Sequence, residues 1–262
     1  MSALVIEGGV VHYEYFGRGR PLIFIHGWLG SWRYWVSAMD ELSENYRVYA
    51  FDLWGFGDSD KSKSRYRVAD YVELLHTFVD ELGVFLPIPL VGHALGATVA
   101  VSFALQYPDY VDRIMAVSLP LVGDAINRRF LSGGGLLDKM LGRSPTDGYT
   151  DVEEEANRAS PDAINQSVQS VMSIDLKPSL QSIPVPLLAL YGENDNVVMP
   201  TNPDILRNVD NNKVHTITMP DTRHFPMLDR SSQFNRLLVD FLEAEENFRQ
   251  ITLKEEWQRR IR

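Results

Sequence analysis

Short, continuous runs of apolar residues alternate along the chain with longer stretches in which apolar residues recur at helical spacing. Runs of about four to eight apolar residues are typical of buried strands, whereas a period of about 3.6 residues is typical of amphipathic helices. Because such strands and helices alternate, the pattern predicts an α/β fold with a mostly parallel sheet and helices on both faces. The predicted elements are a hairpin over 4–6 and 10–15, strands at 22–25, 46–51, 88–91, 114–117, 187–191 and 214–219, and helices over 32–42, 69–82, 95–107 and 231–245.

The segment 121–182 departs from this alternation. Gly133–Gly135 interrupts it, 151–155 is strongly acidic, and no convincing strand pattern appears. We therefore interpret 121–182 as a helical insertion in a core formed by 1–120 and 183–262. Ligands of open α/β sheets bind beyond the carboxyl ends of the strands, so an insertion that follows a strand is predicted to form a lid. The glycine triplet is predicted to let this lid move, because glycine leaves the backbone poorly restrained.

The most informative motif is Gly92-His93-Ala94-Leu95-Gly96, which lies between a predicted strand and a predicted helix. A sharp strand-to-helix turn needs small residues two positions to either side of its middle residue, and glycine stands at both. The run resembles the nucleophile elbow of the α/β-hydrolase superfamily, and the resemblance covers nearly the whole chain. It implies an α/β-hydrolase fold with a helical lid. Ala94 stands where a serine hydrolase has its serine, and alanine has no oxygen that could attack a carbonyl.

An acidic residue and a histidine follow two later strands. Asp195 comes after the predicted strand 187–191, and His224 comes after 214–219. The order of elbow, acid and histidine is the one that the superfamily uses. The resemblance implies that Asp195 fixes the tautomer of His224 and that His224 takes the proton of the nucleophile. Because each position follows a strand, we expect all three to meet at one edge of the sheet.

Other motifs match the superfamily as well. The resemblance implies that the backbone N–H groups of Trp28, after the pair His26-Gly27, and of Leu95 hold an oxyanion. Alone, each of these motifs has a purely structural interpretation, and the loop 52–59 is interpreted as structural because its glycines permit tight turns. Aromatic and histidine residues near strand ends predict an apolar substrate pocket. The predicted pocket residues are His26, Gly27, Trp54, His93 and Phe225.

Leu95 follows Ala94 in the elbow. In this position the chain resembles the serine esterase-like branch of the superfamily. The serine form is expected to be a carboxylesterase-like hydrolase that acts on a small hydrophobic ester, lactone, thioester or activated C–C bond. One alternative is a natural, non-catalytic pseudohydrolase that binds ligands. Another is a cofactor-free lyase or dioxygenase that uses His224 as a base without a serine. Ala94 is either a deliberate Ser-to-Ala substitution or a natural alanine, and the sequence leaves both open.

The amino-acid composition restricts the kinds of partner and cofactor that we expect for this protein. The chain has 25 Lys and Arg against 35 Asp and Glu, and this net charge of −10 argues against nucleic acid or an anionic membrane as a partner. It has no cysteine, which excludes disulfides and thiolate metal sites, and no motif predicts a metal or a cofactor. The start shows no signal segment, so a cytoplasmic location is expected. The uncharged stretch 82–108 contains Pro87 and Pro89, so it predicts a strand, a turn and a helix and not a membrane span.

Overall fold

The computed structural model describes residues 2–127, 149–198, 209, 212–244 and 247–253. Eight strands form one sheet in the order β1-β2-β4-β3-β5-β6-β7-β8, in which β2 is antiparallel to both neighbours and all other pairs are parallel. The strands are β1 (Ser2–Ile6), β2 (Gly9–Phe16), β3 (Arg20–Ile25), β4 (Tyr46–Phe51), β5 (Ile88–His93), β6 (Val111–Val117), β7 (Leu187–Gly192) and β8 (Val214–Met219).

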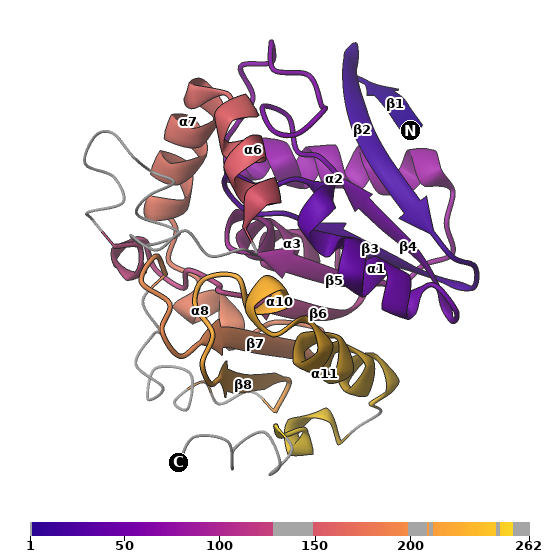
Figure 1. Cartoon of the computed structure of the whole chain (residues 1–262), viewed down its shortest axis with the longest axis vertical. Helices are drawn as coiled ribbons and strands as arrows, with labels where there is room; N and C mark the ends of the chain where they lie inside the picture. Colours follow the sequence, from indigo (N-terminus) through magenta and orange to yellow (C-terminus); the bar gives the residue numbers. More distant parts are fainter. Residues whose placement is uncertain (1, 128–148, 199–208, 210–211, 245–246, 254–262) are drawn as a thin grey trace.

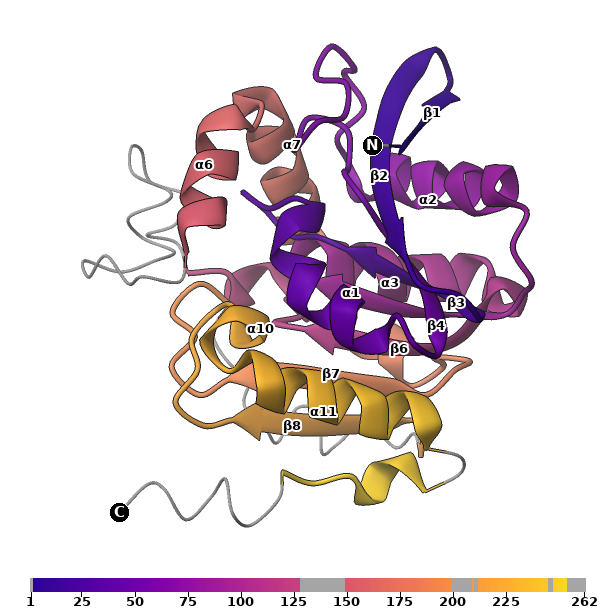
Figure 2. The same ribbon diagram turned by 45° about the vertical axis from the view of Figure 1, so that its right-hand side comes forward.

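Helices cover both faces of this sheet. The pair α1 (Val36–Leu42) and α11 (Ser231–Glu243) lies on one face, and the pair α2 (Val68–Leu82) and α3 (Leu95–Gln106) lies on the other (Figures 1 and 2). Every residue of β5 and of β7 is buried, which follows from coverage on both sides. The shorter helices of the core are η1 (Trp32–Trp35), η2 (Pro108–Tyr110), α10 (Pro226–Asp229) and η4 (Phe248–Gln250). The predicted α/β-hydrolase fold is therefore confirmed.

The helix predicted over 32–42 is wrong in one respect, because it divides into η1 and α1. The N–H groups in the first turn of this segment donate to side chains that lie outside the helix. The Trp32 N–H donates to Asp52 Oδ1 at 2.8 Å, and the Arg33 N–H donates to Ser31 Oγ at 3.2 Å. Side-chain acceptors of this kind satisfy the donors that the start of a helix leaves free, and a tight 3-10 turn is common there.

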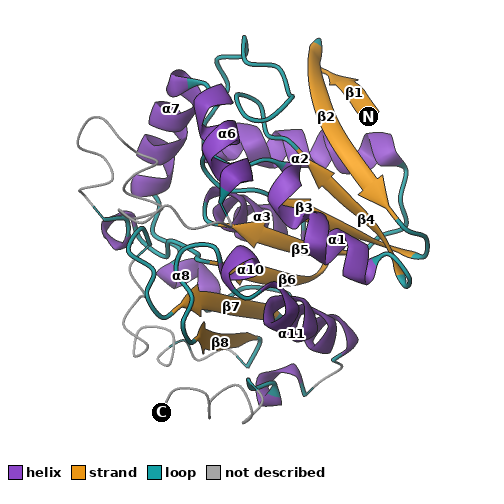
Figure 3. Ribbon diagram, viewed as in Figure 1, coloured by secondary structure: helices purple, strands orange, loops and turns teal. Residues whose placement is uncertain are grey.

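The described parts of the segment between β6 and β7 contain helices joined by loops and add no strand to the sheet. These helices are η3 (Gly123–Ala125), α6 (Thr150–Arg158), α7 (Pro161–Met172) and α8 (Lys177–Leu180). Figures 1 and 3 show α6 and α7 beside the carboxyl ends of the parallel strands. The glycine triplet 133–135 lies outside the described residues, and movement of this segment as a lid remains a prediction.

Among the described residues, no helix combines the length and the apolar character needed to cross a bilayer. The uncharged stretch 82–108 divides into the end of α2, the strand β5 and the helix α3, as its proline and glycine pattern predicted.

Candidate active site

Ala94 occupies a strained turn between β5 and α3. Its backbone has φ 47° and ψ −105°, a region that residues with a Cβ rarely adopt. The flanking glycines make the turn possible: a Cβ on Gly92 would lie 2.4 Å from the Gly96 carbonyl oxygen, and a Cβ on Gly96 would lie 2.2 Å from that of Ile25. The sharp elbow expected from the glycine spacing is thus present, with an alanine at its apex.

Asp195 and His224 form a buried pair at the carboxyl ends of β7 and β8. His224 Nδ1 lies 3.0 and 3.1 Å from the two carboxylate oxygens of Asp195, and both side chains are completely shielded from solvent. Burial by itself would raise the pKa of Asp195, but His224, the Val197 N–H and the Ser118 hydroxyl together hold that pKa below its usual range. The carboxylate therefore stays ionised and accepts the Nδ1 proton, which leaves Nε2 of His224 as an acceptor.

The Nε2 atom of His224 is the open end of this pair. It is buried, and no described residue gives it a hydrogen-bond partner. A buried polar atom without a partner costs about 1–3 kcal/mol. His224 Nε2 is one of seven such side-chain atoms among the described residues, and it belongs to the ring that Asp195 holds from the other side. This nitrogen is therefore placed to receive a proton from a group that enters the site.

Ser118 is a site residue that the sequence analysis missed. It follows β6 directly, has φ 49°, and its hydroxyl donates to Asp195 Oδ2 at 2.8 Å. The same hydroxyl lies 3.4 Å from the backbone oxygen of His224. Its place at the end of a strand is the signal that could have found it, because Asp195 and His224 were found by the same rule.

The loop after β3 touches the elbow. A Cβ on Gly27 would lie 3.1 Å from the Cβ of Ala94, so only glycine allows this approach. His26 holds the loop with both ring nitrogens: the Leu53 N–H donates to Nε2 at 2.9 Å, and Nδ1 donates to the Gly27 carbonyl oxygen at 2.8 Å. Burial lowers the pKa of His26, which keeps the ring neutral in this role.

The two predicted oxyanion donors belong to this region. Leu95 is the first residue of α3, so its N–H has no partner within the helix and lies at the positive end of the helix dipole. Trp28 follows Gly27, and its indole Nε1 donates to Ser167 Oγ on α7 at 3.0 Å. The side chain of Trp28 thus connects the loop after β3 with the helical segment between β6 and β7.

The remaining predicted pocket residues differ in whether they contact His224. The rings of His93 and Phe225 pack against His224, with centroids 4.6 and 5.0 Å away. Trp54 instead accepts a hydrogen bond on its backbone oxygen from the Tyr71 hydroxyl of α2 at 2.9 Å. Its ring lies near the Lys63 ammonium at 5.9 Å. The described contacts therefore join Trp54 to α2 and its preceding loop, not to His224.

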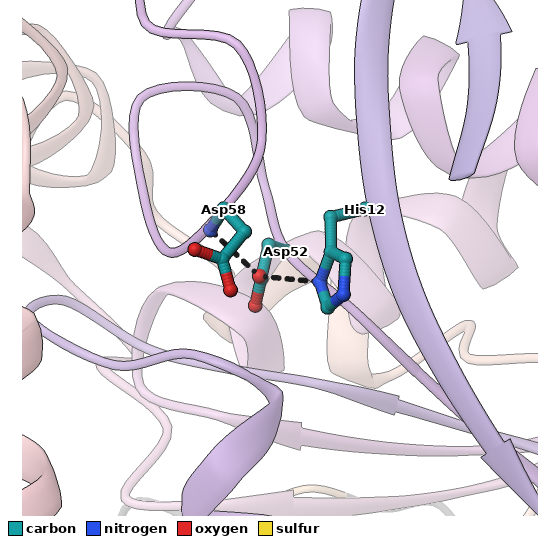
Figure 4. A group of neighbouring side chains, drawn as sticks. All are labelled: His12, Asp52 and Asp58. Carbon is teal, nitrogen blue, oxygen red and sulfur yellow. Dashed lines mark hydrogen bonds and ion pairs between the residues drawn. The ribbon is translucent and has the colours of Figure 1, made fainter. Parts of the chain in front are cut away.

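One group among the described residues has the spacing of a metal site. One ligand atom from each of His12, Asp52 and Asp58 lies within 4.8 Å of the others (Figure 4). The oxygens are already occupied, however. Asp52 Oδ1 accepts from the Trp32 N–H, while Oδ2 accepts from the Asp58 N–H at 2.9 Å and from His12 Nδ1 at 3.0 Å. A cation would have to displace backbone donors that cannot turn away, so we assign this group to bracing the loop after β4.

The fold, the elbow and the buried acid–histidine pair together define the class of protein. Residues 20–168, more than half of the chain, match the family described as alpha/beta hydrolase fold. The chain belongs to this family.

Named relatives give more detail. The chain is 26% identical over 263 residues to pimeloyl-[acyl-carrier protein] methyl ester esterase of Nitrosospira multiformis, covering 88% of this chain and 97% of that protein. It is 35% identical over 147 residues to soluble epoxide hydrolase of Corynebacterium sp. strain C12, covering 50% of this chain and 49% of that protein. The enol-lactonase of Burkholderia xenovorans LB400 has a similar structure, with a TM-score of 0.80, 19% identity, and coverage of 93% of this chain and 100% of that chain. The sequence relatives are thus hydrolases with different substrates.

Proposed function

We propose that the protein carries the substrate-binding and acid–base groups of a serine hydrolase and lacks only the nucleophile. Its substrate class is a small hydrophobic ester, lactone, thioester or activated C–C bond. The observation that carries this proposal is the buried Nε2 of His224, which has no described partner although Asp195 holds the ring from the other side. The resemblance to an esterase and an enol-lactonase supports the ester and lactone classes.

A serine at position 94 would complete a two-step acyl transfer. Its hydroxyl proton passes to Nε2 of His224 while its oxygen bonds to the carbonyl carbon, and the N–H groups of Trp28 and Leu95 hold the resulting oxyanion. The protonated His224, stabilised by Asp195, then gives its proton to the departing alcohol oxygen. A water that loses a proton to His224 then attacks the acyl carbon. The bond from that carbon to the serine oxygen breaks, His224 returns the proton to the serine oxygen, and the acid is released. With Ala94 the first bond cannot form, so the chain binds such compounds without an acyl-enzyme.

A second candidate function follows from the independence of the base from residue 94. The bond between Asp195 and His224 needs nothing from the elbow side chain, so Nε2 can take a proton directly from a bound substrate or a water. This would be serine-independent base chemistry, as in a cofactor-free lyase or dioxygenase. A chain that binds ligands and performs neither reaction is the third possibility that the experiment distinguishes.

The test compares the Ala94 chain with Ala94→Ser on a panel of aryl esters and lactones. Loss of a triad nucleophile costs on the order of 10⁶-fold in turnover, so a gain of that order is expected. His224→Ala in the serine background is the control and should abolish the gain. Since the new hydroxyl gives the buried His224 Nε2 a hydrogen-bond partner, the unfolding free energy should rise by about 1 kcal/mol.

Three outcomes separate the proposals. Activity of Ala94→Ser that depends on His224 supports acyl transfer. Turnover by the Ala94 chain itself, lost in His224→Ala, supports the serine-independent reaction and replaces the first proposal. Binding without turnover in both chains identifies a ligand-binding protein and rejects both reactions.

A further inference from the structure

A chain of buried hydrogen bonds connects the loop after β3 with the residue His224. The Gly27 N–H donates to the Tyr34 hydroxyl, that hydroxyl lies 3.2 Å from His93 Nδ1, and His93 Nε2 lies 2.9 Å from the backbone oxygen of His224. Tyr34, His93 and His224 are all fully or almost fully buried. The three contacts therefore form one continuous path through the interior.

The directions of the bonds in this path follow from its two ends and from the charge of His93. A backbone N–H can only donate and a backbone carbonyl can only accept. The Tyr34 hydroxyl therefore accepts from Gly27, and His93 carries a proton on Nε2. If the His93 ring is neutral, its Nδ1 has no proton and accepts the hydrogen bond of the Tyr34 hydroxyl. Burial, aided by the neighbouring His224 and His26, lowers the pKa of His93 well below its usual value, which agrees with a neutral ring.

The path joins two loops that the sheet does not hold together. In the strand order, β5, β6 and β7 lie between β3 and β8, so no ladder of backbone hydrogen bonds links the loop after β3 to the loop after β8. His93 ends β5, between them, and reaches both sides. The approach is close, because a Cβ on Gly27 would lie 2.7 Å from His93 Nδ1.

We propose that Tyr34 and His93 are positioning residues that set the distance between the oxyanion-binding N–H of Trp28 and the base His224. Gly27 directly precedes Trp28, so a bond to the Gly27 N–H orients the peptide that follows. This inference rests on the proposed function, because it assigns the two residues a role in the acyl-transfer geometry. It gives the Tyr34 hydroxyl a role in the site, where its burial alone would indicate only a structural role in the core.

The test uses Tyr34→Phe with Tyr71→Phe as the matched control. Both hydroxyls are buried and each donates one hydrogen bond, but that of Tyr71 goes to the Trp54 backbone oxygen. In the Ala94→Ser background, Tyr34→Phe should lower kcat about ten- to a hundred-fold and leave KM within about two-fold, because the oxyanion contact tightens only in the transition state. Tyr71→Phe should leave both constants within about two-fold. Equal effects of the two variants would overturn the proposal.

A second variant tests whether both residues act through the same path. The amide of His93→Gln can keep the bond to the His224 carbonyl while it loses the bond from Tyr34. The double variant with Tyr34→Phe should then be no slower than the slower single variant. Losses that multiply would show two independent effects and reject a shared path.

A readout without turnover keeps this inference separate from the proposed function. In the Ala94 chain, ring ¹⁵N shifts should show His93 neutral and protonated at Nε2, and Tyr34→Phe should shift the Trp28 amide and the His224 ring resonances while Tyr71→Phe leaves them in place. If Ala94→Ser is inactive but these shifts appear, acyl transfer fails and the coupling stands. A His93 protonated at Nδ1, or unchanged resonances in Tyr34→Phe, would overturn the path itself.

Discussion

Two buried pairs of aspartate and histidine in the described part of the chain are nearly identical in the distance between carboxylate and ring nitrogen. His224 Nδ1 lies 3.0 Å from Asp195 Oδ2, and His12 Nδ1 lies 3.0 Å from Asp52 Oδ2. Both aspartates follow a strand that runs parallel to its neighbour, β7 in one case and β4 in the other. The contact between acid and imidazole therefore does not by itself distinguish a base from a structural brace.

The second ring nitrogen distinguishes the two pairs. Nε2 of His12 lies 3.4 Å from Glu14 Oε1, so this ring sits between two carboxylates. Burial alone would lower the pKa of His12, but the hydrogen bond and charge of Asp52 outweigh it and the pKa is raised. Neither Nε2 atom has a hydrogen-bond partner among the described residues, but a carboxylate faces that of His12, whereas the described ion pairs of His224 include Asp195 alone. An imidazole held between two acids favours its charged form, whereas one held by a single acid with an open nitrogen can accept a proton.

The aspartates differ as well. Asp52 accepts backbone N–H groups on both oxygens, whereas Oδ2 of Asp195 accepts from Ser118, whose hydroxyl can rotate. If the carboxylate is replaced by an amide, a hydroxyl can rotate and accept a hydrogen bond from the new NH₂ group. A backbone N–H can only donate, so it loses its partner. The difference predicts that the same substitution will affect activity in one pair and stability in the other.

The largest expected effect is that of Asp195→Asn in the Ala94→Ser background. The NH₂ group of the new amide donates a hydrogen bond to Nδ1 of His224. The ring then carries its proton on Nε2, and a protonated Nε2 cannot accept the proton of a serine hydroxyl. We expect kcat to fall about 10⁴-fold, as for other triads that lose the carboxylate. Oδ1 still accepts from Val197 and Val198, so the melting temperature should change little. Kinetics with thermal unfolding measures both.

Asp52→Asn should give the opposite result. Whichever way the amide is turned, its NH₂ group meets a backbone donor, either the Asp58 N–H or the Trp32 N–H. One partly buried N–H then loses its acceptor, which costs about 1–2 kcal/mol of unfolding free energy. Turnover per folded molecule in the Ala94→Ser background should stay within a few-fold. If urea unfolding shows no loss of stability while activity disappears, the roles of the two pairs are exchanged.

The raised pKa of His12 predicts a smaller effect, which is a pH dependence of the unfolding free energy. A histidine whose pKa is higher in the folded state stabilises the fold fully below its unfolded pKa, and this contribution is lost as the pH rises through the folded pKa. Burial lowers the pKa of His26 and His93, so their contribution rises as the pH passes through the unfolded pKa near 6.5 and is nearly complete about one pH unit higher. Urea unfolding between about pH 7.5 and 8.5 should therefore show a decline in the unsubstituted chain that His12→Gln reduces. Equal slopes in both proteins would contradict the prediction.

The smallest expected effect is that of divalent cations on the group His12, Asp52 and Asp58. Since N–H donors and arginines occupy its oxygens, about 1 mM Mg²⁺, Mn²⁺ or Zn²⁺ should shift the melting temperature by less than about 1 °C. Asp58→Asn is the control, because Asp58 bonds to Arg33 at 2.9 Å and can be changed without touching Asp52 side-chain atoms. A shift of several degrees that Asp58→Asn removes would establish a metal site in place of a brace.

Much of the fold could be predicted because its causes are local. Buried strands such as 187–191 and 214–219 appear as apolar runs, and the elbow appears because a sharp turn needs Gly92 and Gly96. Asp195 and His224 could be found because each follows a strand, and parallel strands bring their carboxyl ends to one edge. The prediction of Trp54 as a pocket residue relied on the same rule and stays a prediction; its described contacts are with Tyr71 of α2 and Lys63 of the loop before α2.

The sequence by itself determined the order of strands and helices, the elbow with Ala94 at its apex, and the acid and histidine that follow β7 and β8. Only the tertiary structure decided how these groups are supported, because the supporting partners are far apart in the chain. Ser118 and Asp195 are 77 positions apart, Tyr34 and His93 are 59 apart, and Trp28 and Ser167 are 139 apart. No local pattern marks the hydroxyls of Tyr34 and Ser167, and the place of Ser118 at a strand end does not identify its partner. The two imidazoles differ in this respect: Nε2 of His12 faces Glu14, two positions along the same strand, whereas the surroundings of Nε2 of His224 depend on the packing of elements far apart in the chain.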